Sequence, residues 1–338
     1  MKKIGIIVHQ QQPAICSSMM MHVSLMESAG YEVVLLKNIS VTFAFNEKYN
    51  KIIYSNIKQL KKITKDNNIS DLWTTTADYA IRLKLARIGV PIYLWLQGDD
   101  PSESYMRNHC KWRRYLLERI LAIGFASVSG TVFVSDSMKL YYKEKYSYKK
   151  KSIVVPCLSE FPAKIETGDR MPNSYVYIGG LSVWQCFDET LKIYKRLRTE
   201  NSIFHIITRD TDIAKDKVLE IIGNFDGIEI YPINDRTQIP STLGKFQYGF
   251  LIRKDDIVNY VSSPIKFLEY ISCGVDVIMT SAVPSYADIV KKERIGTIVD
   301  LKTTDKIVVN TYSGHAQDVY EKYFNWDTYV KRYKELFG

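Results

Sequence analysis

Short apolar runs alternate with helical segments along almost the whole chain, and this alternation restricts the fold more than any other feature of the sequence. Strands that alternate with helices of about 10 to 15 residues form βα units, whose strands pair in parallel. The pattern therefore predicts an α/β protein. In the first half, the expected strands are residues 3–8, 31–36, 72–74, 92–96, 131–134 and 152–155, and the expected helices include residues 18–28, 54–66, 77–88 and 111–123.

A loop of mixed polarity, residues 156–174, interrupts the alternation, which restarts with a strand at residues 175–178. The 338 residues of the chain are too many for one ordinary domain, since a domain typically has about 100 to 200 residues. We therefore expect two α/β domains, residues 1–160 and 161–314. Residues 315–338 carry a broken apolar stripe, and we expect a terminal helix that packs back on the first domain.

Composition excludes several classes of protein. The five cysteines are scattered without a Cys-x-x-Cys pair, which favours reduced thiols over a zinc site or a disulfide framework. No run of 18 apolar residues occurs, so we expect no membrane-spanning helix. The first residues read as a strand rather than a signal peptide. We expect a cytoplasmic protein, with a peripheral position on the inner face of the cell membrane as the alternative.

The formal charge of +9 is concentrated in one part of the chain, since residues 101–151 hold eleven Lys and Arg but four Asp and Glu. A basic surface attracts the phosphates of nucleotides, nucleic acids or lipid headgroups, or is simply solvated. Because no recognised nucleic-acid-binding module accompanies the charge, we expect no nucleic acid partner.

The most informative segment is residues 262–278. Ser263 is placed to cap a helix that begins with Pro264, a position where the missing N–H of proline is harmless. The free amides at such a helix start attract a diphosphate. Lys266, in the first turn, adds a full positive charge, and Glu269 lies one turn further on about the same face, where it can accept hydrogen bonds from ribose hydroxyls.

This segment resembles the donor-binding segment of GT-B glycosyltransferases, particularly the retaining enzymes of family 4, in which proline, lysine, glutamate and glycine recur at this spacing. Residues 133–138, 154–156, 175–181 and 324–326 are similar to shorter motifs of the same fold. The resemblance implies two Rossmann-like domains facing each other across a cleft, with a C-terminal helix that crosses back to the first domain.

The resemblance also implies a function. It predicts transfer of a sugar from a nucleotide-sugar donor to a glycan or lipid-linked acceptor, as in bacterial surface polysaccharide synthesis, with retention of configuration. It implies neither a metal nor a cofactor, because the nucleotide sugar is a substrate. Two alternatives stay open, a non-catalytic GT-B binding subunit and a nucleotide-sugar epimerase.

The chain departs from the family at two places. Val261 stands where family members carry an earlier glutamate, and the turn that opens with Gly180 lacks the cations that usually hold the donor phosphates. We expect another cation to replace them, with Arg253 as the first candidate and Arg209 as the second. Gln185, at the end of this turn, is a further candidate for contact with the donor.

Two further segments have both a functional and a structural interpretation. Asp99 and Asp100 follow an expected strand, so they either act on an acceptor hydroxyl, one of them as catalytic base, or cap the next helix. Residues 111–123 place Trp112, Tyr115 and Leu116 on one stripe of a basic helix. This stripe either contacts a membrane surface or faces the core.

Overall fold

The computed structural model describes residues 1–10, 13–158, 170–303 and 307–338, without the side chains of residues 13, 14 and 17. The chain divides into two compact units. Unit 1 consists of residues 1–158 and 326–338, and unit 2 of residues 159–325. The boundary expected between residues 160 and 161 lies outside the described residues. No helix of the described ranges has the length and apolar content needed to cross a bilayer.

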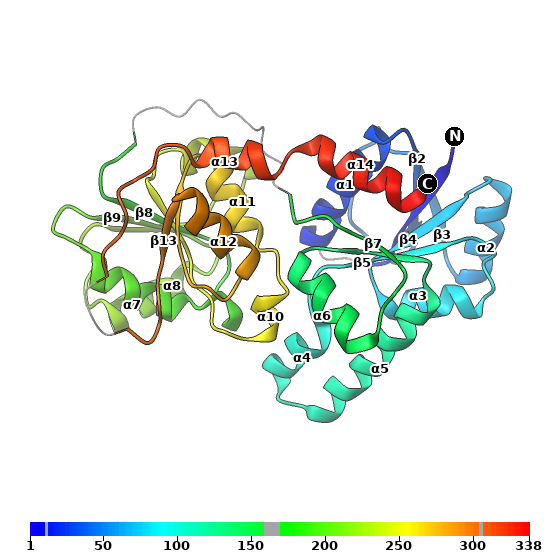
Figure 1. Cartoon of the computed structure of the whole chain (residues 1–338), viewed down its shortest axis with the longest axis horizontal. Coiled ribbons are helices and arrows are strands. Elements are labelled where there is room, and N and C mark those ends of the chain that lie inside the picture. The colour runs from blue at the N-terminus through cyan, green and yellow to red at the C-terminus, as the bar shows by residue number, and fades with distance from the viewer. Residues whose placement is uncertain (11–12, 159–169, 304–306) are drawn as a thin grey trace. The chain divides into compact units, whose positions relative to one another are not determined.

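Unit 1 is built on a seven-stranded sheet with the order β3-β2-β1-β4-β5-β6-β7, in which all neighbours are parallel (Figure 1). Its strands are β1 (Lys3–Val8), β2 (Glu32–Asn38), β3 (Lys51–Tyr54), β4 (Asp71–Thr74), β5 (Ile92–Leu96), β6 (Gly130–Phe133) and β7 (Lys151–Val154). Its helices are α1 (Pro13–Ser28), α2 (Ile57–Asp66), α3 (Ala77–Leu85), α4 (Asp100–Asn108), α5 (Lys111–Ser127), α6 (Asp136–Tyr146) and α14 (Trp326–Phe337).

Unit 2 has a six-stranded parallel sheet with the order β10-β9-β8-β11-β12-β13. Its strands are β8 (Ser174–Ile178), β9 (Ile203–Ile207), β10 (Ile228–Tyr231), β11 (Tyr248–Leu251), β12 (Asp276–Met279) and β13 (Gly296–Ile298). Its helices are α7 (Phe187–Leu197), α8 (Thr211–Ile221), α9 (Ile239–Leu243), α10 (Ile257–Tyr260), α11 (Ile265–Ser272), α12 (Pro284–Glu293) and α13 (Ala316–Tyr323), with short 3-10 turns η1 (Val183–Gln185) and η2 (Arg236–Gln238).

The α/β class expected from the alternating pattern is confirmed in both units. Strands of a parallel sheet are covered on both faces, so they are apolar throughout rather than at alternate positions. Strand β5 illustrates this, because all five of its residues are buried. In the core of unit 1 the rings of Trp73 and Trp95 stack with centroids 5.2 Å apart. The ring of His22, from α1, lies 4.3 Å from Trp95.

Two expectations about elements were wrong. Residues 51–54 form the edge strand β3, and α2 begins only at Ile57, where Asn56 caps it by accepting the N–H of Gln59. Residues 315–338 form two helices instead of one. Helix α13 lies in unit 2, whereas α14 lies in unit 1, where its Tyr333 contacts His22 of α1. The backbone leaves the helical conformation at Phe324, which ends α13.

Candidate functional site

The strand order of unit 2 locates a natural binding position. Strand β8 lies in the middle of the sheet. The next strands in the chain, β9 and β10, are added on one side of it, and β11, β12 and β13 are then added on the other side. In sheets of this kind ligands bind beyond the carboxyl ends of the strands, at the point where the order reverses. Here that point lies between β8 and β11, and the residues directly beyond it are Gly179 and Gly180 after β8, and Ile252 and Arg253 after β11.

Two cationic side chains converge on one acceptor at this point. Lys266, in the first turn of α11, donates from Nζ to Oε1 of Gln185 over 2.8 Å. Arg253 donates from Nη2 to the same oxygen over 2.7 Å, and from Nη1 to the backbone carbonyl of Gln185 over 3.1 Å. The backbone of Arg253 is fixed in turn by Thr280, whose hydroxyl donates to its carbonyl oxygen over 2.7 Å. The structure thus brings together three residues that the sequence had suggested separately.

Both cations are buried, Lys266 with 6% and Arg253 with 4% of its surface exposed. Within the described part of the chain, no carboxylate lies within salt-bridge distance of either. Burial, together with the positive charge of Arg253, holds the pKa of the Lys266 ammonium well below its usual value. Burial also lowers the pKa of Arg253. Two buried cationic groups that share a neutral acceptor would be stabilised by an anion.

The turn after β8 gives the lysine its position. The ammonium of Lys266 lies 4.0 Å above the centre of the Tyr177 ring, a cation–π contact. Gly179 has φ of +132°, and a Cβ at this residue would lie 2.4 Å from Cε of Lys266. Only glycine therefore satisfies both the backbone conformation and the space that the lysine occupies.

The start of α11 differs from the expectation. Ser263 does not cap the helix; Pro264 is the N-cap residue, with φ of −61° and ψ of 116°, and the helix begins at Ile265. The hydroxyl of Ser263 lies 2.7 Å from the hydroxyl of Tyr286 on α12 instead. A serine whose backbone lies one residue too early cannot reach the N2 or N3 amide, so the hydroxyl bonds elsewhere.

Glu269 lies further along α11 and is 3% exposed. Its Oε1 accepts a hydrogen bond of 2.9 Å from Nη2 of Arg236, whose side chain is half exposed. Sequence reasoning missed Arg236, since it lies in η2, in a loop whose approach to α11 has no local sequence pattern. The carboxylate predicted to contact ribose therefore already has an arginine partner.

Gly180 and Arg209 lie at the edge of this cluster. Both are exposed, and Arg209 follows β9, the neighbour of β8. A Cβ on Gly180 would have the carboxylate of Asp210 as its nearest neighbour at 3.9 Å, so the turn is open on this side. Arg209 is thus not part of the buried pair of cations.

The two aspartates predicted in unit 1 have different environments. Asp99 is fully buried; its Oδ2 caps α4 by accepting the N–H of Ser102, and its Oδ1 accepts the hydroxyl of Tyr142 over 2.5 Å. Of the two roles that the sequence left open for these aspartates, Asp99 therefore has the structural one, as the cap of the next helix. Asp100 is exposed. Loss of hydration and the negative charge of Asp99 raise the pKa of the Asp100 carboxyl.

Glu103, one turn into α4, was not predicted. Its carboxylate lies against Gly98, where an added Cβ would come within 2.2 Å of Oε1. Burial, followed by the negative charge of Asp100, raises the pKa of Glu103 to about 7. A carboxyl group that titrates near neutral pH can both accept and release a proton. Gly98, which precedes the two aspartates, was the sequence feature that could have revealed Glu103. In the sequence, however, it indicates only a turn and not that a side chain packs against it.

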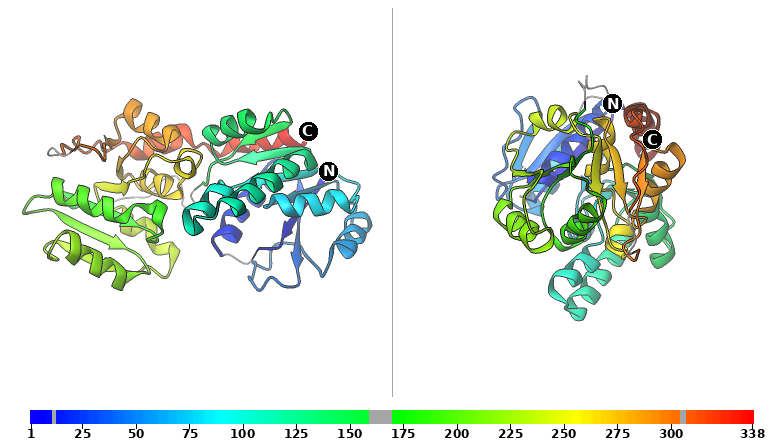
Figure 2. Two further views of the ribbon diagram at one scale, coloured as in Figure 1. Left: turned by 90° about the horizontal axis from the view of Figure 1, so that it is seen from below. Right: turned by 90° about the vertical axis from the view of Figure 1, so that its left-hand side faces the viewer.

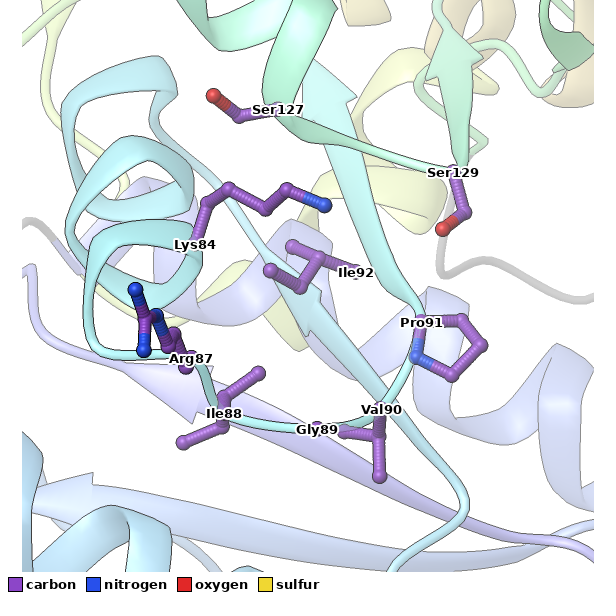
Figure 3. A pocket seen from close by; sticks show the side chains of 9 residues that line it. All are labelled: Lys84, Arg87, Ile88, Gly89, Val90, Pro91, Ile92, Ser127 and Ser129. Carbon is purple, nitrogen blue, oxygen red and sulfur yellow. The ribbon is translucent and has the colours of Figure 1, made fainter.

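A cavity of about 450 Å³ lies elsewhere in unit 1 (Figure 3). Lys84 and Arg87, from the end of α3 and the residues after it, and Ser127, the last residue of α5, contribute to its wall. Ile92, the first residue of β5, also lines it. The cavity therefore lies at the amino ends of the strands, opposite to the end where ligands of such sheets bind.

The sequence matches no protein-family description. It also matches no curated protein sequence. The fold, however, is similar to that of solved structures. HepE of Anabaena in complex with UDP has 9% identity and a TM-score of 0.71, over 99% of both chains. Sucrose-phosphate synthase of Thermosynechococcus elongatus has 9% identity and a TM-score of 0.68, over 100% of this chain and 98% of that one.

A third similar structure is WaaG, a glycosyltransferase involved in lipopolysaccharide biosynthesis, with 10% identity and a TM-score of 0.61, over 98% of this chain and 94% of that one. These similarities extend over both units. The chain therefore has the GT-B fold that the resemblance of residues 262–278 had implied.

Proposed function

We propose that the chain is a glycosyltransferase and that unit 2 binds the diphosphate of its nucleotide-sugar donor. The observation that carries the proposal is the pair of buried cations, Lys266 and Arg253, which share Oε1 of Gln185 at the carboxyl ends of β8 and β11. A diphosphate would bring negative charge into direct contact with the two cations, neither of which has a carboxylate within salt-bridge distance among the described residues. It also brings several acceptor oxygens to Lys266 Nζ and Arg253 Nη2, which now share Oε1 of Gln185.

Each predicted donor residue has a place in this proposal. The two cations and the first amides of α11 bind the diphosphate, with Gln185 holding the cations in position. Glu269 accepts hydrogen bonds from the ribose hydroxyls, either together with its hydrogen bond from Arg236 or in place of it. Arg209 and the backbone of Gly180 extend the site on its exposed side, and Ser263 fixes the approach to α11 through its bond with Tyr286.

The same residues provide the chemistry that transfer needs. Negative charge grows on the diphosphate as the bond to the sugar breaks, and fixed positive groups in a dry site stabilise that charge. The proposal therefore requires neither a metal nor a cofactor. Retention of configuration is the proposed outcome on the strength of the sequence resemblance, with buried Val261 in the position of the earlier glutamate.

We place the acceptor side in unit 1. Asp100 and Glu103 are the candidates to orient the acceptor hydroxyl or take its proton, and the capping bonds of Asp99 support the loop that carries them. The proposed acceptor is a glycan or a lipid-linked glycan of a bacterial surface polysaccharide. The role of WaaG in lipopolysaccharide biosynthesis supports this choice, and the complex of HepE with UDP makes uracil the first base to test.

The test is a thermal-shift panel of UDP, GDP, ADP and dTDP. We expect one of them to raise the melting temperature of the wild-type protein, because a ligand that binds only the native state stabilises it. The same ligand should not stabilise Lys266→Ala or Arg253→Ala, although both variants fold. If no nucleoside diphosphate stabilises the wild type, or if both variants respond as it does, the site is wrong.

Turnover separates the enzyme from the two alternatives. We expect the nucleotide sugar that corresponds to the stabilising base to be hydrolysed slowly and to be transferred to an added acceptor. Binding without turnover of any such donor would support a non-catalytic subunit. Conversion of the donor to an epimer without loss of its sugar would instead support the epimerase.

A further inference from the structure

Helix α5 of unit 1 presents an apolar stripe to the solvent. Trp112 is 72% exposed, Tyr115 53%, Leu116 49% and Ile123 50%. Residues at this spacing lie on one side of a helix. The alternative in which the stripe faces the core is therefore wrong, and the surface needs another explanation.

The opposite side of α5 is already packed. Leu121, Gly124 and Phe125 are its buried residues. Gly124 lies so close to α3 that an added Cβ would come within 2.6 Å of the Cβ of Ala77. Because this contact fixes the rotation of the helix, the exposed stripe is a stable feature of unit 1. In Figure 2, α4 and α5 project from the strands of their unit.

Positive charges accompany the stripe. Lys111, Arg113 and Arg119 are exposed, and among the described residues no acidic side chain pairs with them. Residues 104–127 contain a single acidic residue, Glu118. It is occupied by Arg114 at 3.4 Å and by Lys145 at 2.9 Å. The net positive charge of the stripe is thus not compensated within the helix.

The chemistry of the apolar residues narrows the choice of partner. Tryptophan and tyrosine prefer the boundary between lipid tails and headgroups, where one end of the ring is apolar and the other is wet. The rings of Trp112 and Tyr115 lie 5.7 Å apart, so they form one aromatic surface. Arginine and lysine beside such a surface attract anionic headgroups.

We propose that α5 docks unit 1 on the surface of an anionic lipid bilayer. Trp112, Tyr115, Leu116 and Ile123 enter the interface, while Lys111, Arg113 and Arg119 contact lipid phosphates. The surface is separate from the proposed donor site, so the inference stands even if the chain transfers no sugar. If the acceptor is lipid-linked, docking would bring the protein to the plane in which its acceptor lies.

The experiment is co-sedimentation of the whole protein with vesicles. One set contains phosphatidylcholine alone, and the other contains about a third phosphatidylglycerol, which supplies the negative charge. We expect binding to the anionic vesicles only, with affinity falling as salt screens the charges. We also expect the fluorescence of Trp112 to shift to shorter wavelength on binding, and this shift to be absent from Trp112→Ser.

Variants separate the two contributions. Trp112→Ser with Leu116→Ser should weaken binding to anionic vesicles by about tenfold or more, because apolar burial is lost. Arg113→Gln with Arg119→Gln should remove the preference for anionic vesicles. The matched control is Ile213→Ser with Leu219→Ser on α8 of unit 2, residues that are 56% and 50% exposed. This control should bind as the wild type does.

Three results would overturn the proposal. The first is that the wild-type protein does not bind anionic vesicles. The second is that the α8 control loses as much vesicle binding as the α5 variants do. The third is a monomer–dimer equilibrium that Trp112→Ser abolishes while vesicle binding persists, which would make the stripe a contact between copies of the chain. The stabilisation by nucleoside diphosphates should be the same in all α5 variants, so failure here is distinguishable from failure of the donor site.

Discussion

The positive charge of Lys266 is expected to lower the stability of the fold but to strengthen the binding of a diphosphate. The ammonium is buried beside another cation, and this environment lowers its pKa. In the absence of a ligand, the charged form therefore destabilises the fold. We predict that Lys266→Met, of similar volume, raises the free energy of unfolding by about 1–2 kcal/mol. The same change should weaken binding of the nucleoside diphosphate about 100-fold or more, since a charge-assisted contact is lost.

The pH dependence follows from the same shift. Because the folded state binds the lysine proton less tightly than the unfolded state, the destabilisation is full below the lowered pKa. It disappears as pH rises from that value to about 10.5. Urea unfolding across this range should show the rise in the wild type and its absence in Lys266→Met. Lys254→Met, whose lysine is 58% exposed, is the control and should change stability by less than about 0.5 kcal/mol. Loss of folding in Lys266→Met would refute this account.

Glu103 supports a prediction about rate. Its pKa is raised to about 7, chiefly by burial and then by the charge of Asp100, while Arg107 acts in the other direction. If Glu103 accepts the proton of the acceptor hydroxyl, kcat/KM should rise with pH through about 7, because the carboxylate is the active form. Glu103→Gln should lower kcat/KM about 100-fold or more and lose this rise. A rise that persists in the variant would assign the proton transfer to another group.

At the scale of elements, the turn after β8 can be tested with adjacent glycines. Gly179→Ala places a Cβ 2.4 Å from Cε of Lys266 and strains a residue with φ of +132°. We expect a loss of about 1–3 kcal/mol in stability and weaker diphosphate binding, because the lysine must move away from Gln185. Gly180→Ala meets its nearest atom only at 3.9 Å and should be within about 0.5 kcal/mol of the wild type. Equal effects of the two changes would show that the position of Lys266 does not depend on the turn.

Elements with a strong apolar run were predictable to within a residue or two. The expected strands at residues 3–8 and 92–96 have the observed bounds. Strand β3 was missed because it is a short edge strand, with Lys51 and Ile53 exposed and only Tyr54 fully buried. Helix α4 was expected only through the alternative of a cap at Asp99 or Asp100, and its bounds were not predicted because its residues are mostly polar. In such segments the tertiary environment, rather than local periodicity, decides the structure.

The candidate site was predictable where charge and chain position coincide. Lys266, Arg253 and Gln185 were each proposed from the sequence, because each follows a strand or begins a helix at the same end of the sheet. Their shared hydrogen bonds were not predictable, since they join residues up to 81 positions apart. Arg236 and Glu103 were missed for the same reason. The cap at Ser263 was wrong by one residue, which is the usual uncertainty of a helix boundary.

For the whole molecule, one topology is used twice. The first six strands of unit 1 have the order 3-2-1-4-5-6, and the strands of unit 2 repeat it. This order depends on where apolar runs and turns occur and not on particular side chains. That is why the GT-B fold persists at about 9% identity to HepE and sucrose-phosphate synthase. The side chains at the reversal points remain free to differ, as the missing cations after Gly180 illustrate.

The final prediction concerns the contact in unit 1 between α1, near the start of the chain, and α14, at its end. His22 of α1 lies in the core, 2% exposed, and its Nδ1 is 2.5 Å from the hydroxyl of Tyr333 on α14. Burial lowers the pKa of His22 from 6.5 to about 3. In this pH range the unfolded chain binds a proton at His22 and the native state does not. The free energy of unfolding therefore falls as pH drops from 6.5 towards 3.

Between pH 7 and pH 5 this linkage should lower the free energy of unfolding by about 2 kcal/mol. His22→Gln removes the titration, so the loss over this pH interval should shrink by about that amount, even though the variant is less stable at pH 7. Tyr333→Phe is the matched control, because it removes the hydrogen bond but keeps the imidazole, and its pH dependence should be that of the wild type. Urea unfolding followed by tryptophan fluorescence suits the measurement, since Trp95 contacts the His22 ring. An unchanged acid dependence in His22→Gln would mean that the imidazole is hydrated in the native state and that α14 is released from α1 before the unit unfolds.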